Sequence, residues 1–216
     1  MKKVIMPLLL ILSFSFLMAV ESDPSAVVGY VKYDMTAGNN LVALPMEQGF
    51  TLASDVGTYA GANIVQKWNP ASESWDPVIS ELMPGWWDND FAVGVGDILL
   101  IGVASAGALY SVGGLPTPAT YSLVAGANAI MIPLNRSDLT MASDAGTEIG
   151  ANVVQAWDSV SDSWDPVISE LMPGWWDNDF SISIGKPLLV GVGAASTWPA
   201  PPAPAPTRKV MMSVSK

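Results

Sequence analysis

Two stretches of the chain place aromatic rings beside carboxylates, and these residue types are suited to binding a ligand. The sequence PGWWDND occupies residues 84–90 and again residues 173–179. A tryptophan ring can cover the apolar face of a sugar, and neighbouring carboxylates accept hydrogen bonds from its hydroxyl groups. The predicted glycan-binding residues are Trp86, Trp87, Asp88 and Asp90 and their counterparts Trp175, Trp176, Asp177 and Asp179.

Both stretches lie inside an eighteen-residue segment, SWDPVISELMPGWWDNDF, whose copies at 74–91 and 163–180 are identical. Identity falls to 12 of 22 positions just before the segment and to 5 of 12 just after it. Two explanations remain open: a recent copying event in the gene, or a role that tolerates little change. Because adjacent side chains of an extended backbone point to opposite sides, we expect one tryptophan of each pair to be exposed.

Two other interpretations fit the same residues. Asp88, Asp90 and the nearby Glu81 offer oxygen ligands for Ca²⁺, although the glycine and glutamate spacing of an EF-hand is absent. Alternatively, the segment is a structural loop whose Asp and Asn side chains cap turns and whose tryptophans fill the base of a small barrel or sandwich.

The composition restricts the possible chemistry. The chain contains no histidine and no cysteine, which excludes a Ser-His-Asp triad, a thiol nucleophile and the usual zinc or copper ligands. Glycoside hydrolysis by two carboxylates is the one familiar enzyme class left, and a small duplicated module leaves little room for its cleft. We therefore predict no enzymatic activity, no catalytic residue, no cofactor and no metal other than the Ca²⁺ alternative.

The beginning of the chain has the layout of a secretory signal peptide. Lys2 and Lys3 precede an apolar run over residues 4–20, and a polar stretch follows. Pro7 interrupts this run, which is shorter than the roughly 20 apolar residues of a spanning helix. We predict a signal peptide over residues 1–19, export, and no membrane contact after cleavage. The net charge of −11 argues against nucleic acid as a partner.

The rest of the chain contains an internal repeat. For example, LASDVGTYAGANIVQKW (52–68) aligns with MASDAGTEIGANVVQAW (141–157). Each copy contains short runs of β-branched and aromatic residues bounded by Gly, Pro, Asn or Ser, which are typical of strands. We predict an all-β protein of two tandem small β-sandwich or barrel-like modules, each with one short helix. The modules cover residues 27–113 and 119–196, and a Pro-rich linker with a C-terminal strand covers residues 197–216.

Local signals predict where the helices and the other tryptophans lie. ASDVGTYAG and ASDAGTEIG indicate the two helices, with Ser54 and Ser143 as their N-caps. Trp68 and Trp75 lie on the two arms of a hairpin and are expected to pack inside the protein. The same expectation holds for their counterparts Trp157 and Trp164.

Further signals concern strands and turns. The alternating FSISI at 180–184 is typical of a half-buried strand. Gly96 and Gly185 suit two-residue hairpin turns that need a positive φ. Pro187 favours an edge strand, because proline cannot donate a hydrogen bond to a neighbouring strand.

Three segments look like the opening strand of a module, although there are only two modules. They are VVGYVKYDM (27–35), TYSLV (120–124) and KVMMSV (209–214). The last can extend its own sheet, be disordered, or add to a sheet edge of the next molecule across a stiff proline-rich spacer. The third possibility predicts a head-to-tail homopolymer. Its predicted assembly residues are Arg208, Lys209, Val210, Met211 and Met212.

The pattern of NLVALP, ASDVG, ANIVQKW, GWW and F-x-V-x-x-G resembles a repeat module of secreted and cell-surface proteins of environmental bacteria. Its general form is G-x-N-L-V-x-L-P followed by T-A-S-D-x-G, and the resemblance covers most of both modules. It implies a surface or extracellular structural role and no particular activity or binding residue. We predict an exported structural or adhesive bacterial protein that self-assembles through the surplus strand. The alternative is a carbohydrate-binding protein that recognises an extracellular glycan.

Overall fold

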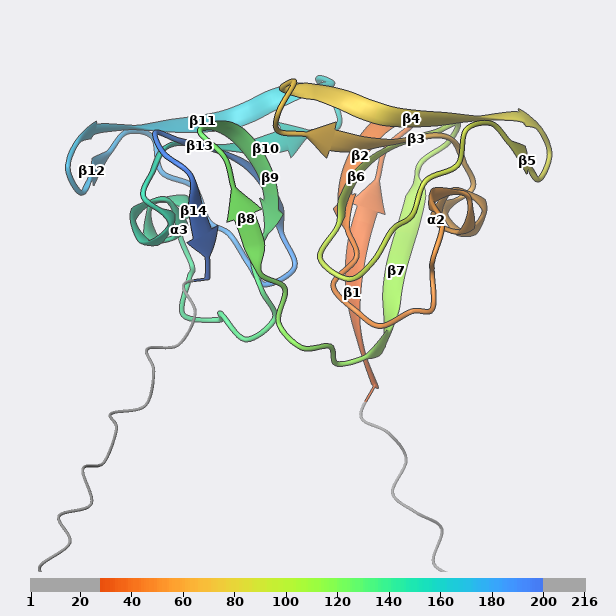
Figure 1. The fold of residues 1–216 in the computed structure, drawn as a ribbon, viewed down its shortest axis with the longest axis horizontal. Helices are drawn as coiled ribbons and strands as arrows, with labels where there is room; N and C mark the ends of the chain where they lie inside the picture. Colours follow the sequence, from red (N-terminus) through yellow and green to blue (C-terminus); the bar gives the residue numbers. More distant parts are fainter. Residues whose placement is uncertain (1–27, 200–216) are drawn as a thin grey trace, which may run out of the picture.

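The structure, a computed structural model, describes residues 28–199 and folds them into two modules that lie side by side (Figure 1). The predicted signal peptide and C-terminal strand lie outside the described residues. Module 1 comprises β1 (Val28–Met35), β2 (Gly38–Ala43), α2 (Ala53–Ala60), β3 (Ala62–Asn69), β4 (Ser74–Met83), β5 (Trp86–Trp87), β6 (Ile98–Val103) and β7 (Gly107–Gly114). Module 2 comprises β8 (Tyr121–Leu123), β9 (Gly126–Met131), α3 (Ala142–Ile149), β10 (Ala151–Asp158), β11 (Ser163–Met172), β12 (Trp175–Trp176), β13 (Pro187–Val192) and β14 (Ser196–Trp198).

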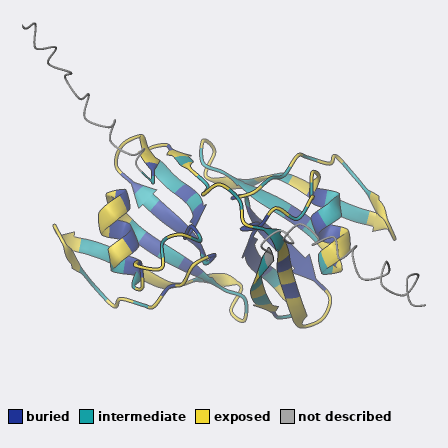
Figure 2. Ribbon diagram, turned by 90° about the horizontal axis from the view of Figure 1, so that it is seen from below, coloured by how far each residue is buried: buried dark blue, intermediate teal, exposed yellow. Residues whose placement is uncertain are grey.

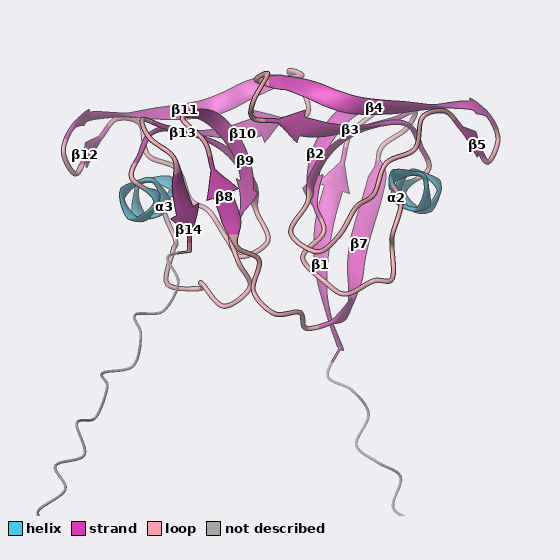
Figure 3. Ribbon diagram, in the orientation of Figure 1, coloured by secondary structure: helices cyan, strands magenta, loops and turns pink. Residues whose placement is uncertain are grey.

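Each module builds the same pair of antiparallel sheets. The five-stranded sheet has the order β2-β6-β3-β4-β5 in module 1 and β9-β13-β10-β11-β12 in module 2. The two-stranded sheets are β1-β7 and β8-β14. The two helices lie toward the outer flanks of the molecule (Figure 3), and neither has the length and apolar character needed to cross a bilayer. The prediction of an all-β protein with two tandem modules and one short helix in each is confirmed.

The strands β6 and β13 are apolar along their whole length because both of their faces are buried. In β6, Leu99 and Ile101 face the core of module 1, whereas Ile98 and Leu100 face a separate core between the modules. The core of module 2 similarly joins its sheet to α3 and to Leu123 and Trp198 of the β8-β14 pair. Burial is therefore greatest on the inner strands and least at the outer tips (Figure 2).

The helices begin and end as their sequences predict, but their N-caps differ from the expectation. Helix α2 follows Leu52 and ends at Gly61, whose φ of 64° suits glycine. Ser54 lies inside the first turn and caps nothing. The Asp55 carboxylate accepts the Leu52 N–H at 3.0 Å instead, and Asp90, distant in the sequence, accepts the N–H of Ser54 at 3.1 Å. Helix α3 repeats this arrangement, so the prediction of Ser143 as an N-cap is also wrong.

Pro187 does not mark an edge strand, because β13 lies between β10 and β9. It is the first residue of β13 and lies opposite Met131 of β9. Pairing with β10 begins two residues later, at Leu189. The ring nitrogen therefore lies beyond the ladder with β10, where no backbone donor is needed.

Residues 180–184 do not form the predicted strand of a hairpin. Ile182 is buried and Ser181 and Ser183 are exposed, as the alternation suggests, but Ile184 is exposed as well. A single bridge between Met141 and Ser181 connects the segment to the rest of the module. Gly185 has the predicted positive φ and lies in a turn that the Lys186 N–H closes by donating to the Ser183 carbonyl at 3.0 Å. The turn is not part of a hairpin, because residues 180–184 before it do not pair with β13.

The modules meet at a junction with its own apolar core, formed by Leu41, Ala43, Ile98, Leu100 and Met131. Hydrogen bonds at the junction are repeated by the internal symmetry. The Trp68 Nε1–H donates to the Ala127 carbonyl at 2.9 Å, and the Trp157 Nε1–H donates to the Asn39 carbonyl at 3.0 Å. The junction therefore pairs equivalent surfaces of the two modules.

Four tryptophans form a continuous array across this junction. The Trp75 and Trp164 rings stack with centroids 6.4 Å apart and planes 9° apart. Trp68 and Trp157 each pack edge-on against their hairpin partner, at 5.2 and 5.1 Å. These rings are partly buried, and the surface that three of them pack against is the apolar core between the modules. A register shift between Gln66 and Trp68 interrupts the β3-β4 ladder, which resumes with Trp68 opposite Trp75. This ring-bearing end of the hairpin contacts the other module.

Candidate functional site

The predicted ligand-binding tryptophans lie on a short hairpin at each end of the molecule. In module 1, β4 turns into β5 through Pro84 and Gly85, and Gly85 has a φ of 77°. This conformation suits the third position of a type II turn, where glycine is favoured. The Glu81 side chain accepts the Gly85 N–H at 2.7 Å and stabilises the turn. Figure 1 shows β5 and its counterpart β12 at opposite ends of the molecule.

One tryptophan of each pair is exposed, as predicted from the extended backbone. Trp86 is 57% exposed and lies opposite Met83, which is also 57% exposed. Leu82 beside them is 56% exposed, and module 2 repeats the arrangement with Trp175 58% exposed. Each end of the molecule thus presents a small apolar tip. We call the tip of module 1, formed by Leu82, Met83 and Trp86, the tryptophan tip.

The second tryptophan of each pair packs against the helix. The Trp87 ring lies against Gly57 of α2, and its Nε1–H donates to the Thr58 hydroxyl at 3.2 Å. Trp176 lies against Gly146 of α3 in the same way. Each helix therefore has glycine at this position because a larger side chain would collide with the tryptophan ring.

The aspartates of the segment stabilise the module itself. The Asp88 carboxylate accepts the Ser80 N–H at 2.6 Å and so connects the residue after β5 to β4. The Asp90 carboxylate accepts the Ser54 and Phe91 N–H groups, at 3.1 and 2.9 Å, and the Ser54 hydroxyl. It therefore satisfies an N–H group of the first turn of α2, where a negative charge is also favourable. Asp177 and Asp179 make the equivalent bonds in module 2.

These bonds separate the acids that were candidates for a Ca²⁺ site. Glu81 bonds to the β4-β5 turn, Asp88 to β4 and Asp90 to the first turn of α2. Over residues 28–199, no group of three or more acidic side chains gathers closely enough to hold a metal ion.

We predict that Asp90→Ala lowers the free energy of unfolding by about 1 to 2 kcal/mol, because it removes a helix cap and leaves its donors without a partner. Urea denaturation followed by circular dichroism measures this loss. Asp179→Ala should have the same effect in module 2. The matched control is Asp76→Ala, which changes an exposed carboxylate of the same segment. If Asp90→Ala is as stable as the control, the carboxylate does not stabilise the helix.

A shallow hollow of about 850 Å³ lies between α2 and the hairpin turn of module 1. Its lining includes three aromatic side chains, Phe50, Tyr59 and Trp87, together with hydroxyl and carboxylate groups from α2. The Phe50 and Tyr59 rings are 5.3 Å apart. This combination of aromatic and polar groups can bind a sugar. The identical segment predicted Trp87 as part of such a site but gave no signal for Phe50 or Tyr59.

The equivalent hollow of module 2, about 500 Å³, has a different second wall. By the repeat alignment, Leu139 replaces Phe50 and Glu148 replaces Tyr59. Asp138 adds a second carboxylate to the lining. Arg136 forms ion pairs with both acids, at 2.8 Å to Asp138, and its guanidinium holds the pKa of Glu148 below its ordinary value. The two hollows therefore share Trp87 or Trp176 but differ in chemistry. The eight predicted residues lie in the same places in the two modules, but the side chains around Trp87 and Trp176 differ.

Comparison with protein-family models, with curated proteins and with solved structures finds no match to this chain.

Proposed function

We propose that the protein is an exported structural or adhesive protein that acts outside a bacterial cell and assembles with copies of itself. Assembly occurs when residues 209–214 of one molecule add as a strand to a sheet edge of the next. The observation that supports this proposal is that, within residues 28–199, the outer edge of β1 pairs with no other strand. Strand addition needs such an edge, because it supplies the backbone groups that a new strand can pair with.

The β1-β7 pair has one occupied edge and one free edge. The outer edge of β7 is covered, because the Val112 N–H donates to the Gln48 side chain at 3.3 Å and Glu47 bridges to Gly114. In residues 28–199, β1 has β7 as its single strand neighbour. Tyr30, opposite Val112, is 67% exposed and presents an aromatic side chain beside that edge. The part of this edge around Tyr30, with its exposed aromatic side chain, is a typical site of pairing with another chain. Residues 31–34 of the same strand line a cleft at the junction with module 2.

The charge distribution favours the C-terminal segment as the occupant. Residues 28–199 contain eighteen acidic and four basic side chains, whereas Arg208, Lys209 and Lys216 lie in the last nine residues. Opposite charge on the two partners steers their association. The spacer PAPPAPAP at 199–206 is of a type that stays extended at roughly 3 Å per residue and can carry the strand to a neighbour. The contact joins different surfaces of the two copies, so it produces rings or filaments.

We predict that removal of residues 207–216 abolishes assembly and leaves a folded monomer. Light scattering after size-exclusion chromatography and electron microscopy of negatively stained protein measure the change. Val210→Pro with Met212→Pro is the matched variant, because it preserves length and charge but removes strand donors. On the acceptor side, Tyr30→Pro should have the same effect, because the Tyr30 N–H faces the free edge. An intact protein that stays monomeric at high concentration contradicts the proposal.

Carbohydrate binding is the second candidate function, and the aromatic hollow of module 1 favours it. A sugar lying against Trp87 and Tyr59 should shift the tryptophan fluorescence when oligosaccharides are titrated. Tyr59→Ala should remove this shift, whereas Trp175→Ala at the other end of the molecule should not. Either proposal gives the protein no catalytic role. Turnover of an oligosaccharide that is lost in Asp90→Asn and Asp179→Asn would contradict both.

A further inference from the structure

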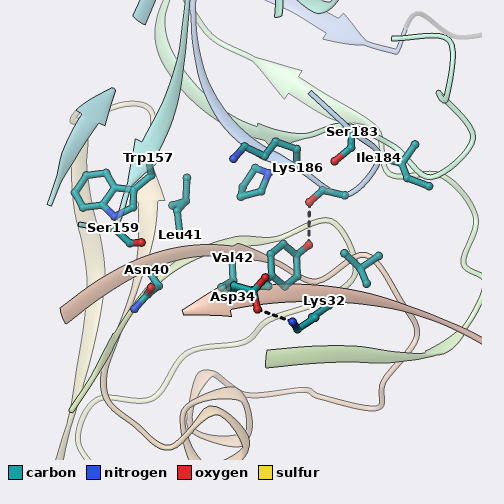
Figure 4. A pocket seen from close by; sticks show the side chains of 14 residues that line it. Lys32, Asp34, Asn40, Leu41, Val42, Trp157, Ser159, Ser183, Ile184 and Lys186 are labelled. Carbon is teal, nitrogen blue, oxygen red and sulfur yellow. Dashed lines mark hydrogen bonds and ion pairs between the residues drawn. The ribbon is translucent and has the colours of Figure 1, made fainter. Parts of the chain in front are cut away.

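A cleft of about 270 Å³ opens at the junction, between β1 and β2 of module 1 and the turn before β13 of module 2 (Figure 4). Its apolar lining includes Leu41, Trp157 and Pro187, and its polar lining includes Ser183 and Lys186. The volume is near the lower limit, about 300 Å³, of pockets that hold small ligands. The cleft is therefore large enough for a single small molecule.

Lys186 is the notable polar group of this cleft. Its side chain extends from the module 2 side toward Trp157 and Leu41 (Figure 4). Across residues 28–199, no carboxylate lies within ion-pair distance of its ammonium group. Burial lowers the pKa of Lys186, because the charged amine loses water without gaining a partner. An amine held in this way is able to pair with an anion that enters the cleft.

Several other polar groups of the cleft are already engaged in hydrogen bonds or ion pairs. The Tyr33 hydroxyl donates to the Gly185 carbonyl at 2.9 Å, and the Trp157 Nε1–H donates to Asn39. Asn40 is buried and bonds to Thr36 and Gly38. These bonds hold the walls of the cleft in place. Lys32 and Asp34 pair with each other at 2.6 Å at the exposed rim.

The internal repeat allows Lys186 of module 2 to be compared with the equivalent residue of module 1. The equivalent position in module 1 is Asp97, which pairs with Lys67 at 2.8 Å. In module 2, Lys186 replaces Asp97 and Ala156 replaces Lys67, so the pair is lost and a single cation remains. The rim differs as well, because Lys32 and Asp34 correspond to Thr120 and Ser122. One of two equivalent places on a duplicated scaffold therefore carries an unpaired positive charge.

We propose that this cleft binds a small molecule carrying a carboxylate, which pairs with the Lys186 ammonium while the rest of the molecule lies against the Trp157 ring. An acidic monosaccharide such as a uronic acid has the required size, charge and apolar ring face. The net negative charge of the protein does not prevent binding. Surface charges beyond about 8 Å are screened at physiological salt, whereas a partly buried pair is screened much less.

Titration of the full-length mature protein with glucuronate, acetate and glucose tests the proposal. Glucuronate should bind and shift the backbone amide NMR signals of residues 183–187, and acetate should bind more weakly at the same signals. Glucose lacks the carboxylate and should leave them unchanged. Lys186→Met should weaken glucuronate binding by at least about tenfold, because it removes the charged partner. Lys67→Met is the matched control and should bind glucuronate like the unchanged protein.

Lys186→Met should fold, because it replaces a partly buried amine with an apolar side chain of similar length. We expect its Tm to rise by about 2 to 4 °C, since the desolvation of the unpaired ammonium opposes folding. Loss of binding in a more stable variant cannot be a consequence of unfolding. If glucuronate and acetate leave the signals of residues 183–187 unchanged, or if Lys67→Met weakens binding as much as Lys186→Met, the proposal is wrong.

Discussion

Trp75→Ala is expected to lower the free energy of unfolding by about 3 kcal/mol, the lower part of the range for removing a packed tryptophan. The Trp75 ring contacts Trp68 edge-on in its own module and stacks on Trp164 of the other module. Truncation therefore removes contacts within module 1 and across the junction at once. Trp164→Ala should cost a similar amount, because the internal repeat gives Trp164 the same environment.

Urea denaturation monitored by circular dichroism and by fluorescence measures this effect. With the junction intact, we expect one transition that both probes follow. In Trp75→Ala the modules become less coupled, so the two probes should report separate transitions. The loss in the double variant with Trp164→Ala should be smaller than the sum of the two single losses, because both variants remove the same stack.

Trp86→Ala is the matched control for the junction. Trp86 belongs to the same identical segment but is exposed at the tryptophan tip, and changes at exposed positions usually stay within about 0.5 kcal/mol. If Trp75→Ala is as stable as Trp86→Ala, the junction does not hold the two modules together in solution.

Gly57→Ala is expected to destabilise the protein by about 1 to 3 kcal/mol through overpacking. In an ordinary helix the same change would stabilise by roughly 0.5 to 1 kcal/mol, because alanine restricts the unfolded chain more than glycine does. Here a methyl group at Gly57 would lie 2.6 Å from Cζ2 of Trp87, too close for the ring to remain in place. Gly146→Ala should behave in the same way, since Trp176 covers it.

Thermal and urea denaturation of three variants separate overpacking from other causes. Gly107→Ala is the control, because a methyl group at that position meets no atom within 4 Å. The double variant Gly57→Ala with Trp87→Leu should be less destabilised than the sum of its two single changes, because the smaller side chain leaves room for the methyl group. A Gly57→Ala variant that is more stable than the unchanged protein would show that the ring can move away.

The structure bears on why two copies of an eighteen-residue segment are identical. Trp75 is held by the junction, Trp87 by the helix glycine, Asp88 by β4 and Asp90 by the first turn of the helix. Packing and hydrogen bonding therefore account for residues that resemble a binding site in the sequence. They do not account for the tryptophan tip, whose side chains are all exposed. In this segment, the tip is where a contact with another molecule would explain the identity.

Features that depend on neighbouring residues in the chain could be predicted from the sequence. The repeat indicated two modules, short apolar runs indicated strands, and the segments ending at Gly61 and Gly150 indicated the helices. Adjacent tryptophans were predicted to separate into an exposed and a packed ring, because strand side chains alternate between two faces.

Other features arise between residues that are far apart in the sequence, and the tertiary structure alone reveals them. Asp90, and not Ser54, accepts a hydrogen bond from the first turn of α2, because the chain after β5 returns to that turn. The tryptophans of the two hairpins form a junction, because the modules meet through equivalent surfaces. Lys186 lies in a cleft because β1 and β2 of the other module form its opposite wall. The sequence by itself determined the modules and their elements through local backbone preference and side-chain alternation, whereas which surfaces meet depends on packing between distant segments.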